Sequence, residues 1–378
     1  MDENKNDVPL PEVVSGQVVV DGKVKDPKIK KSHWPPTKKQ LLVVGSVVIA
    51  LVLGIGAYFM FFTTEQPKKP VVVAKKLPPK PTTIASNLTG LQVDPAANQR
   101  PVTGAMIENS LEARPQSGLD QAGVVFEAIA EGGITRFLAL FQDSQPDYIG
   151  PVRSVRPYYA QWCMGFDCAI AHVGGSPEAL GDIQSWGTKD LDQYVNGNSY
   201  WRINTRYSPH NVYTSTQKLN ELALGKGYSA AEFTPIVRKP DAPSKTPNAT
   251  SVDLNISSYN FNSHYDWDIK TNSSKRSQAG VPHMTVNATG KESQITPKTS
   301  VVLEMSYGIA FDKHSSYGVL SSGPARVFQD GTVSDVTWSK TDLKSQIVLT
   351  DASGKPFALN AGQTWFVATN TLSDAVYR

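Results

Sequence analysis

The stretch from Glu131 to Gly175 decides the fold and contains the segments EGGITRFLALFQD, IGPVRSVR and CAIAHVGGSP. Ile134 to Phe141 and Ala169 to Val173 are short apolar runs bounded by turn residues, a pattern typical of buried strands. Glycine, arginine and histidine gather where these two predicted strands begin or end. Polar and charged side chains therefore cluster at the ends of two predicted core strands, and this stretch is the best candidate for a functional site.

Two arginines, Arg153 and Arg156, stand just before a predicted helix that begins at Pro157 and continues to Phe166, because proline is tolerated in a first helical turn. Free backbone N–H groups, the helix dipole and two guanidinium forks together suit a phosphate or a carboxylate. The alternative is an internal salt-bridge network, since buried charges are normally paired. The carboxylates available for such pairing are Glu127, Glu131 and Asp143.

Two histidines, His172 and His210, lie in later parts of the predicted N-terminal domain. His172 ends an apolar run, and the next residues predict a turn into a helix with Ser176 as its N-cap. A histidine in this position can act as an acid or a base, although a hydrogen-bonded core residue is the more frequent role. His210 and Asn211 form a second polar pair, before a helix predicted from about Ser215 to Leu224.

These motifs define the candidate site. The candidate catalytic residues are the titratable side chains near strand ends: Glu127, Asp143, His172 and His210. The candidate ligand-binding residues are arginines, glycines and asparagines of the same motifs: Arg114, Arg136, Arg153, Arg156, Gly174, Gly175, Asn109 and Asn211. The six histidines are scattered without a partner at ligand spacing, so we expect neither a metal nor a cofactor.

Length and composition limit the possibilities. A chain of 378 residues predicts two folded units with accessory segments. The net charge of +3 is small and much of the lysine excess lies in the tails, which argues against nucleic acid as a partner. The two cysteines, Cys163 and Cys168, exclude a disulfide scaffold and a four-cysteine zinc site. They either pair with each other outside the cytoplasm or remain as buried free thiols.

The N-terminal region predicts a membrane anchor. Residues 1–40 read as a disordered tail, and Leu41 to Phe62 contains no charge. About 22 residues of helix span the hydrocarbon core of about 30 Å, and the run is too long and begins too late for a cleaved signal peptide. The short tail favours an orientation with the tail inside and the bulk of the chain outside the cytoplasm. We therefore predict a single-pass protein of the cell membrane.

The remaining chain divides by composition. We predict a Pro/Lys-rich spacer at 63–95, an α/β or α+β N-terminal domain at 96–230, a linker at 231–252 and a smaller, mainly β domain at 253–378. The last part holds short runs separated by turn signals, which favours a small antiparallel sandwich or barrel. Its GVPHMT string contains His283, a residue that can face the first domain.

The strings MIENSLEARPQSGL, EGGITRFLALF, IGPVRSVRPYY, HVGGSPEAL and SPHNVYTS, in this order, resemble the YerB-like family of bacterial envelope proteins. The resemblance runs from about Val102 to the C-terminus. It implies an extracytoplasmic pair of domains on a Gram-positive-type membrane and no established reaction. Members commonly carry a lipid-attachment cysteine, which the apolar run replaces here. The positions matching the polar motifs are Asn109, Arg114, Gln116, Glu127, Gly132, Gly133, Arg136, Arg153, Arg156, His172, His210 and Asn211.

Two classes of function fit these observations. The first is a non-catalytic module that binds a cell-envelope glycan, an anionic polymer or an envelope protein through an Arg/Gly/His-lined cleft. The second is a hydrolase or transferase acting on a phosphate-linked or glycan substrate, with the arginines neutralising charge and a carboxylate or histidine as acid or base. The sequence contains no nucleophile elbow, metal-ligand spacing or phosphate loop, which favours the first class.

Overall fold

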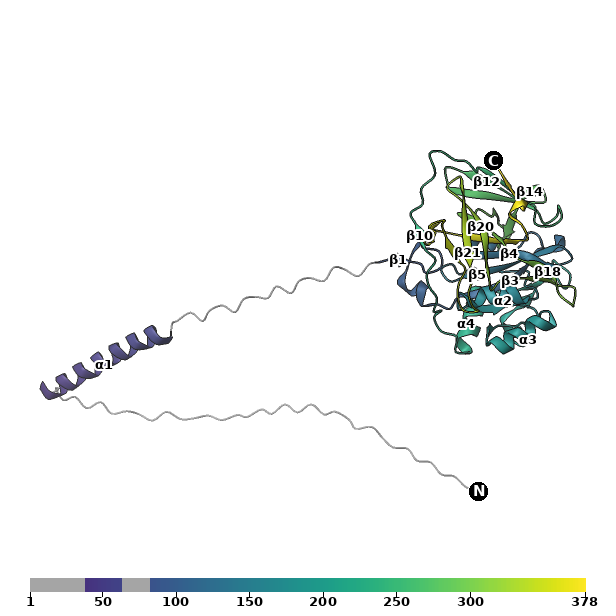
Figure 1. Cartoon of the computed structure of the whole chain (residues 1–378). Coiled ribbons are helices and arrows are strands. Elements are labelled where there is room, and N and C mark those ends of the chain that lie inside the picture. The colour runs from purple at the N-terminus through teal and green to yellow at the C-terminus, as the bar shows by residue number, and fades with distance from the viewer. Residues whose placement is uncertain (1–37, 63–81) are drawn as a thin grey trace, which may run out of the picture. The chain divides into compact units, whose positions relative to one another are not determined.

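The structure is a computed structural model that describes residues 38–62 and 82–378 (Figure 1). The predicted tail and most of the predicted spacer lie outside the described residues. The chain forms two compact units, Met1–Pro78 and Pro79–Arg378. The second unit begins before the predicted end of the spacer, because residues 84–93 form a small two-stranded sheet and Leu88 is fully buried in the core.

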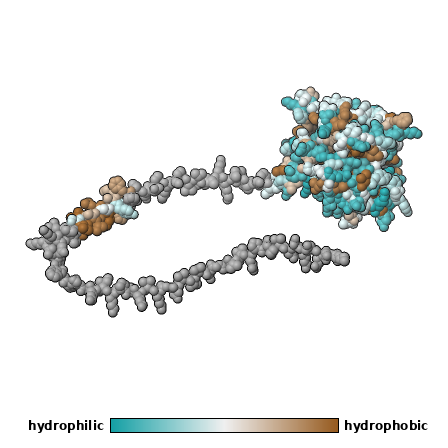
Figure 2. Space-filling view, turned by 90° about the horizontal axis from the view of Figure 1, so that it is seen from below, coloured by the Kyte–Doolittle hydropathy of each residue, from teal (hydrophilic) through white to brown (hydrophobic). Residues whose placement is uncertain are grey.

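Helix α1 (Lys38–Phe62) covers the apolar run. Its large apolar side chains are exposed from Val47 to Phe61, and Figure 2 shows the described part of this helix mostly in the hydrophobic colour. Among the described helices, none meets the length and hydropathy required of a membrane span. The membrane span stays a prediction.

The second unit is built on a ten-stranded mixed sheet with the order β22-β21-β20-β17-β24-β4-β5-β3-β6-β7. Its strands are β3 (Thr103–Glu108), β4 (Val124–Glu131), β5 (Ile134–Phe141), β6 (Ala169–Ala171), β7 (Lys189–Asp190), β17 (Thr299–Glu304), β20 (Ser322–Gln329), β21 (Thr332–Ser339), β22 (Val348–Thr350) and β24 (Thr364–Thr369). Strand β24 pairs in parallel with both β17 and β4. Strands from both halves of the chain therefore form one continuous sheet.

A second, five-stranded sheet has the order β14-β13-β12-β11-β25. Its strands are β11 (Ser251–Leu254), β12 (Ser263–Asp268), β13 (Ser273–Gln278), β14 (Val281–Pro282) and β25 (Ala375–Tyr377). Shorter pairs are β1 (Ile84–Ala85) with β2 (Gln92–Val93), β8 (Trp201–Arg202) with β9 (Val212–Tyr213), β10 (Arg238–Lys239) with β23 (Leu359–Asn360), β15 (Met284–Val286) with β16 (Glu292–Gln294) and β18 (Tyr307–Ile309) with β19 (Ser315–Tyr317). The helices are α2 (Pro157–Met164), α3 (Pro177–Trp186) and α4 (Thr216–Gly225). Figure 1 shows the five-stranded sheet, marked by β12 and β14, at one end of this unit and the helices at the other.

Two hydrophobic cores lie on the two faces of the large sheet, because successive side chains of a strand point to opposite faces. Leu138 and Leu140 of β5 belong to the first core, together with the aromatic residues of α2. Phe137 and Phe141 of the same strand belong to the second core, with residues of α4 and of the five-stranded sheet. The face of the large sheet on which a side chain lies therefore determines which core it packs into.

The coarse fold prediction is confirmed, with a mixed α/β N-terminal part and a mainly β C-terminal part. Strand β5 has the predicted bounds, α2 begins at Pro157, and Ser176 caps α3 by accepting a hydrogen bond from the Ala179 N–H. The prediction of a separate sandwich or barrel needs correction, because the C-terminal strands β17, β20, β21, β22 and β24 extend the N-terminal sheet. Side-chain alternation identifies strands, but it does not identify the strand with which each one pairs.

Candidate functional site

Two arginines hold one carboxylate at the end of β4. Glu131 ends that strand, and Gly132 and Gly133, with φ of +56° and +79°, turn the chain into β5. Nη2 of Arg136 lies 2.6 Å from Oε1 of Glu131, and Nη2 of Arg156 lies 2.5 Å from Oε2. The arginine side chains are only 2% and 3% exposed, whereas Glu131 is 32% exposed. The carboxylate therefore lies between solvent and two buried cations.

The electrostatic environment of Glu131 favours the ionised form of its carboxyl group. Burial raises the pKa of Glu131, but the two arginines outweigh it and the pKa is lowered overall. Burial, followed by the neighbouring Arg136, lowers the pKa of Arg156. The Nε atoms of both arginines are buried and have no hydrogen-bond partner in the described structure. Two guanidinium groups thus share a single carboxylate, and part of their donor capacity is unused.

A second carboxylate lies beside the first group. Glu108 ends β3 and is the register partner of Arg136 on β5, so the two residues share one face of the sheet. Nε of Arg153 lies 3.2 Å from Oε1 of Glu108, and Nδ1 of His210 lies 3.0 Å from Oε2. Glu108 was missed as a site residue, although its place at the end of a predicted strand was a usable signal.

We call the three arginines with their two carboxylates the arginine rim: Arg136, Arg153, Arg156, Glu108 and Glu131. Within ion-pair distance, three guanidinium groups share these two carboxylates, and the partly exposed Asp312 also interacts electrostatically with Arg156. The side chains of Arg153 and Glu131 are 24% and 32% exposed, so the rim reaches solvent. Arg153, the partly exposed arginine of the rim, can donate charge-assisted hydrogen bonds to an anionic ligand.

Glu127 is not part of the rim, which corrects the expectation that the arginines face it. Glu127 is the register partner of Phe137, so its side chain points to the opposite face from Arg136. There it forms a fully buried ion pair with Arg276 of β13, whose Nη2 lies 2.9 Å from Oε2 of Glu127. Nε1 of Trp365 donates to the same oxygen at 3.0 Å. Both oxygens of this carboxylate are bonded, and its side chain is 0% exposed.

The ion pair belongs to a buried network that joins the two halves of the chain. Arg276 donates from Nη1 to Nδ1 of His283, and Nε2 of His283 donates to Oε1 of Gln116 at 2.9 Å. Gln116 donates to Oδ1 of Asn109 at 2.9 Å, and Nε of Arg114 donates to the same atom at 3.1 Å. We call this group the buried network: Glu127, Arg276, His283, Gln116 and Asn109, with Arg114 at its edge. His283 therefore faces the N-terminal part, as predicted.

Arg276 was missed entirely by the sequence analysis. It lies in β13, within the polar string SSKRSQ, whose buried positions are Ser273, Arg276 and Gln278 rather than apolar residues. A strand of this composition carries no hydrophobic alternation, so no sequence signal was available. Its partner on β4 lies 149 residues earlier in the chain.

His172 is fully buried and has two hydrogen-bond partners. Its Nδ1 lies 2.9 Å from the Gly174 carbonyl oxygen, and its Nε2 lies 2.9 Å from Oδ1 of Asp190. Burial raises the pKa of Asp190, but His172, the Asp192 N–H and Lys226 together outweigh this, and the pKa is lowered overall. The Gly174 carbonyl also accepts the Val155 N–H at 3.0 Å, and Val155 forms a bridge with Gly175. His172 and the two glycines thus support the loop that carries the arginines of the rim.

The remaining predicted residues are distributed elsewhere. Asp143 follows the C-terminal end of β5 and accepts hydrogen bonds from Ser86, at 2.6 Å, and from Thr89. It therefore fixes the loop between β1 and β2 against the large sheet. Asn211 accepts a hydrogen bond from Nη1 of Arg202 at 2.7 Å. Neither residue joins the rim through these contacts.

Cys163 and Cys168 form a disulfide, which decides between the two alternatives left open by the sequence. Metal ligation receives no support from the described part of the chain, where no group of three or more His, Cys, Asp or Glu residues is arranged to hold a metal ion.

Two regions of the chain match the models of one protein family. Residues 88–229 match the N-terminal domain model, and residues 252–366 the C-terminal domain model, of a family described as a protein of unknown function, DUF3048. The chain belongs to this family.

Among individual proteins, the chain is similar to the putative lipoprotein YerB of Bacillus subtilis (strain 168). The two are 32% identical over 317 residues, which cover 82% of this chain and 91% of the relative. A crystal structure of YerB protein from Bacillus subtilis matches with a TM-score of 0.70 and 31% identity, and covers 78% of this chain and 99% of that chain. The resemblance found in the sequence motifs is confirmed.

Proposed function

We propose that the protein is a membrane-anchored extracytoplasmic module that binds an anionic polymer of the cell envelope at the arginine rim. The observation that carries this proposal is that three guanidinium groups of the rim have only two carboxylates within ion-pair distance. Guanidinium forks match phosphate and carboxylate groups in bidentate geometry. A polymer that repeats such groups supplies the missing negative charge.

The anchor in this proposal is helix α1. The run from Leu41 to Phe62 has no charged residue, and the described large apolar side chains of the helix are exposed. The relative from Bacillus subtilis is named a putative lipoprotein, which supports an envelope location for this chain. The two cysteines of this chain are joined in a disulfide at Cys163 and Cys168, so we assign the anchoring role to a single membrane-spanning helix.

The test uses the folded unit Pro79–Arg378 with purified cell-wall fractions that contain or lack their anionic polymer. We expect binding to the complete fraction only, with an affinity that falls as salt rises. Arg153→Gln removes the most exposed arginine of the rim and should weaken binding several-fold. Release of soluble product during this assay would instead favour the hydrolase or transferase.

Arg326→Gln is a closely matched control. Nε of Arg326 lies 3.2 Å from Oδ1 of Asp335 and its side chain is 24% exposed, which matches the distance and the arginine exposure of Arg153 with Glu108, whereas Asp335 is 77% exposed and Glu108 is 5% exposed. Equal losses in the two variants, or equal binding to wall fractions with and without the polymer, would overturn the proposal.

A further inference from the structure

An apolar pocket of about 480 Å³ adjoins the first core beside the end of α2. Its buried base consists of phenylalanine rings. Phe126 and Phe366 stack with their centroids 4.9 Å apart, and Phe166 meets Phe126 edge-on at 6.0 Å. This volume lies in the range of small-molecule pockets, which are mostly apolar with few polar groups.

Partly buried apolar side chains form the walls. They come from the segment after the N-terminal part and from the segments on either side of β22: Phe233, Ile236, Ile347 and Phe357. All four pack against the first core and remain partly exposed. The opening thus shows solvent a surface that an apolar ligand can cover.

The loop that forms one wall is held in place. The buried Lys340 donates from Nζ to the carbonyl oxygens of Asp342 at 2.9 Å, Leu343 at 3.0 Å and Ser345. Gly165, at the end of α2, is so close to this loop that a Cβ there would lie 2.7 Å from the Ser345 oxygen. The pocket is therefore preformed, and its occupation requires little ordering of the chain.

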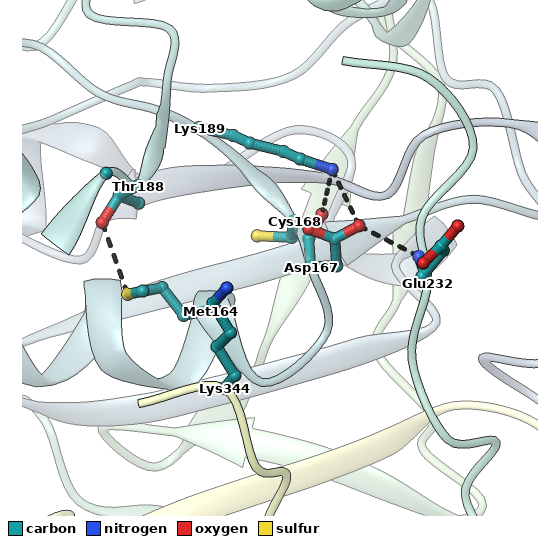
Figure 3. A pocket seen from close by; sticks show the side chains of 8 residues that line it. Met164, Asp167, Cys168, Thr188, Lys189, Glu232 and Lys344 are labelled. Carbon is teal, nitrogen blue, oxygen red and sulfur yellow. Dashed lines mark hydrogen bonds and ion pairs between the residues drawn. The ribbon is translucent and has the colours of Figure 1, made fainter. Parts of the chain in front are cut away.

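A polar pocket of about 360 Å³ shares Glu232 and Lys344 with the apolar pocket (Figure 3). In it, Lys189 forms an ion pair with Asp167 at 2.8 Å, so these two charges cancel. Lys344 and Glu232 are both exposed, and neither side chain pairs with another of the residues drawn in Figure 3. The mouth thus presents one exposed cation and one exposed anion.

A hydrogen-bond donor in the apolar pocket is also unused. Nε2 of Gln346, which lines this pocket, is buried and has no partner among the described residues. A buried donor without a partner is costly, and a ligand oxygen bonds to this one when the Gln346 side chain turns toward the pocket. A hydrocarbon alone does not supply that oxygen, whereas an ester or phosphate does.

We propose that this pocket binds a single-chain amphiphile with a zwitterionic head group. The hydrocarbon chain covers the phenylalanine base, the anionic part of the head group meets Lys344, and its ammonium group meets Glu232. The charges of the mouth favour a zwitterion, because a purely anionic head group meets Glu232 and a purely cationic one meets Lys344. The site is separate from the arginine rim and does not depend on the function proposed for it.

The first test is calorimetric titration of Pro79–Arg378, which forms a compact unit on its own, with lysophosphatidylethanolamines of increasing chain length below their micelle concentrations. Each added methylene should tighten binding about fourfold, equivalent to about 0.8 kcal/mol, until the pocket is full. Affinity that does not depend on chain length would overturn the proposal. This test needs no variant.

Variants then locate the site. Thr234→Trp fills the apolar pocket from an exposed position and should weaken binding at least about tenfold, the equivalent of about 1.4 kcal/mol. Lys344→Gln should weaken it several-fold, whereas the exposed Lys270→Gln should leave it unchanged. If Thr234→Trp keeps the unfolding midpoint and binds as the unchanged chain does, the ligand lies elsewhere and the proposal fails.

Discussion

Strand β4 carries two glutamates four residues apart, and each one meets an arginine partner in a different setting. Glu127 belongs to the buried network, where its side chain and that of Arg276 are 0% exposed and the two charges balance. Glu131 belongs to the arginine rim, where it is 32% exposed and two arginines compete for it. A balanced, dry pair holds the halves of the chain together, whereas an unbalanced, partly wet group retains capacity for a ligand.

The largest expected effect is on the buried network. Arg276→Met leaves the Glu127 carboxylate buried without a counter-charge, which should lower the free energy of unfolding by about 3–5 kcal/mol. Urea denaturation of Pro79–Arg378 measures this. The double variant with Glu127→Gln should recover much of the loss, because it removes the unpaired charge. A loss below about 1 kcal/mol in the single variant would show that the buried pair of Glu127 and Arg276 does not hold the two halves of the chain together.

The next effect concerns the shared carboxylate of the rim. Glu131→Gln removes charged hydrogen bonds from Arg136 and Arg156, so the free energy of unfolding should fall by about 1.5–3 kcal/mol. The same change frees two guanidinium groups and should strengthen binding of the anionic polymer. Weaker binding by a folded Glu131→Gln variant would show that the rim is purely structural.

A pH effect separates the two regions further. Burial, and then the charge of Arg276, hold the pKa of His283 well below the ordinary value of 6.5. Below about pH 6.5 the unfolded chain therefore binds a proton that the folded chain does not, and stability falls as the pH drops, by up to about 1.4 kcal/mol per pH unit. Unfolding midpoints between about pH 5 and pH 8 measure this slope. His283→Gln should remove it, and an unchanged slope in that variant would assign it to other groups.

The smallest expected change in stability is at the exposed part of the rim. Glu108 is buried but keeps His210 as a second partner when Arg153 is replaced, so Arg153→Gln should cost about 1 kcal/mol in the free energy of unfolding. Its effect on polymer binding should be the larger one. A substantial loss of stability together with unchanged polymer binding would show that Arg153 supports the fold and does not contact the polymer.

Much of the local structure was predictable. The apolar run of β5, the proline that begins α2 and the serine that caps α3 act through neighbouring residues, and each lies where the sequence places it. The rim was partly predictable as well, because Arg153 and Arg156 precede a helix and Arg136 lies in a strand beside Glu131. The polar hairpin of β12 and β13 was not, since its strands lack an apolar run.

Within each strand the sequence alone indicated which side chains share a face, because side chains alternate along a regular strand with a period of two. The register of β4 against β5, with its irregularity between Ile129 and Glu131, decided that Glu131 rather than Glu127 meets Arg136. Only the tertiary structure decided what each face meets: β24 beside β4, and Arg276 against Glu127 across 149 residues of chain. The physical reason is the sequence separation over which each interaction acts. Local preferences act over a few residues, whereas strand pairing and buried ion pairs depend on how segments far apart in the chain pack together.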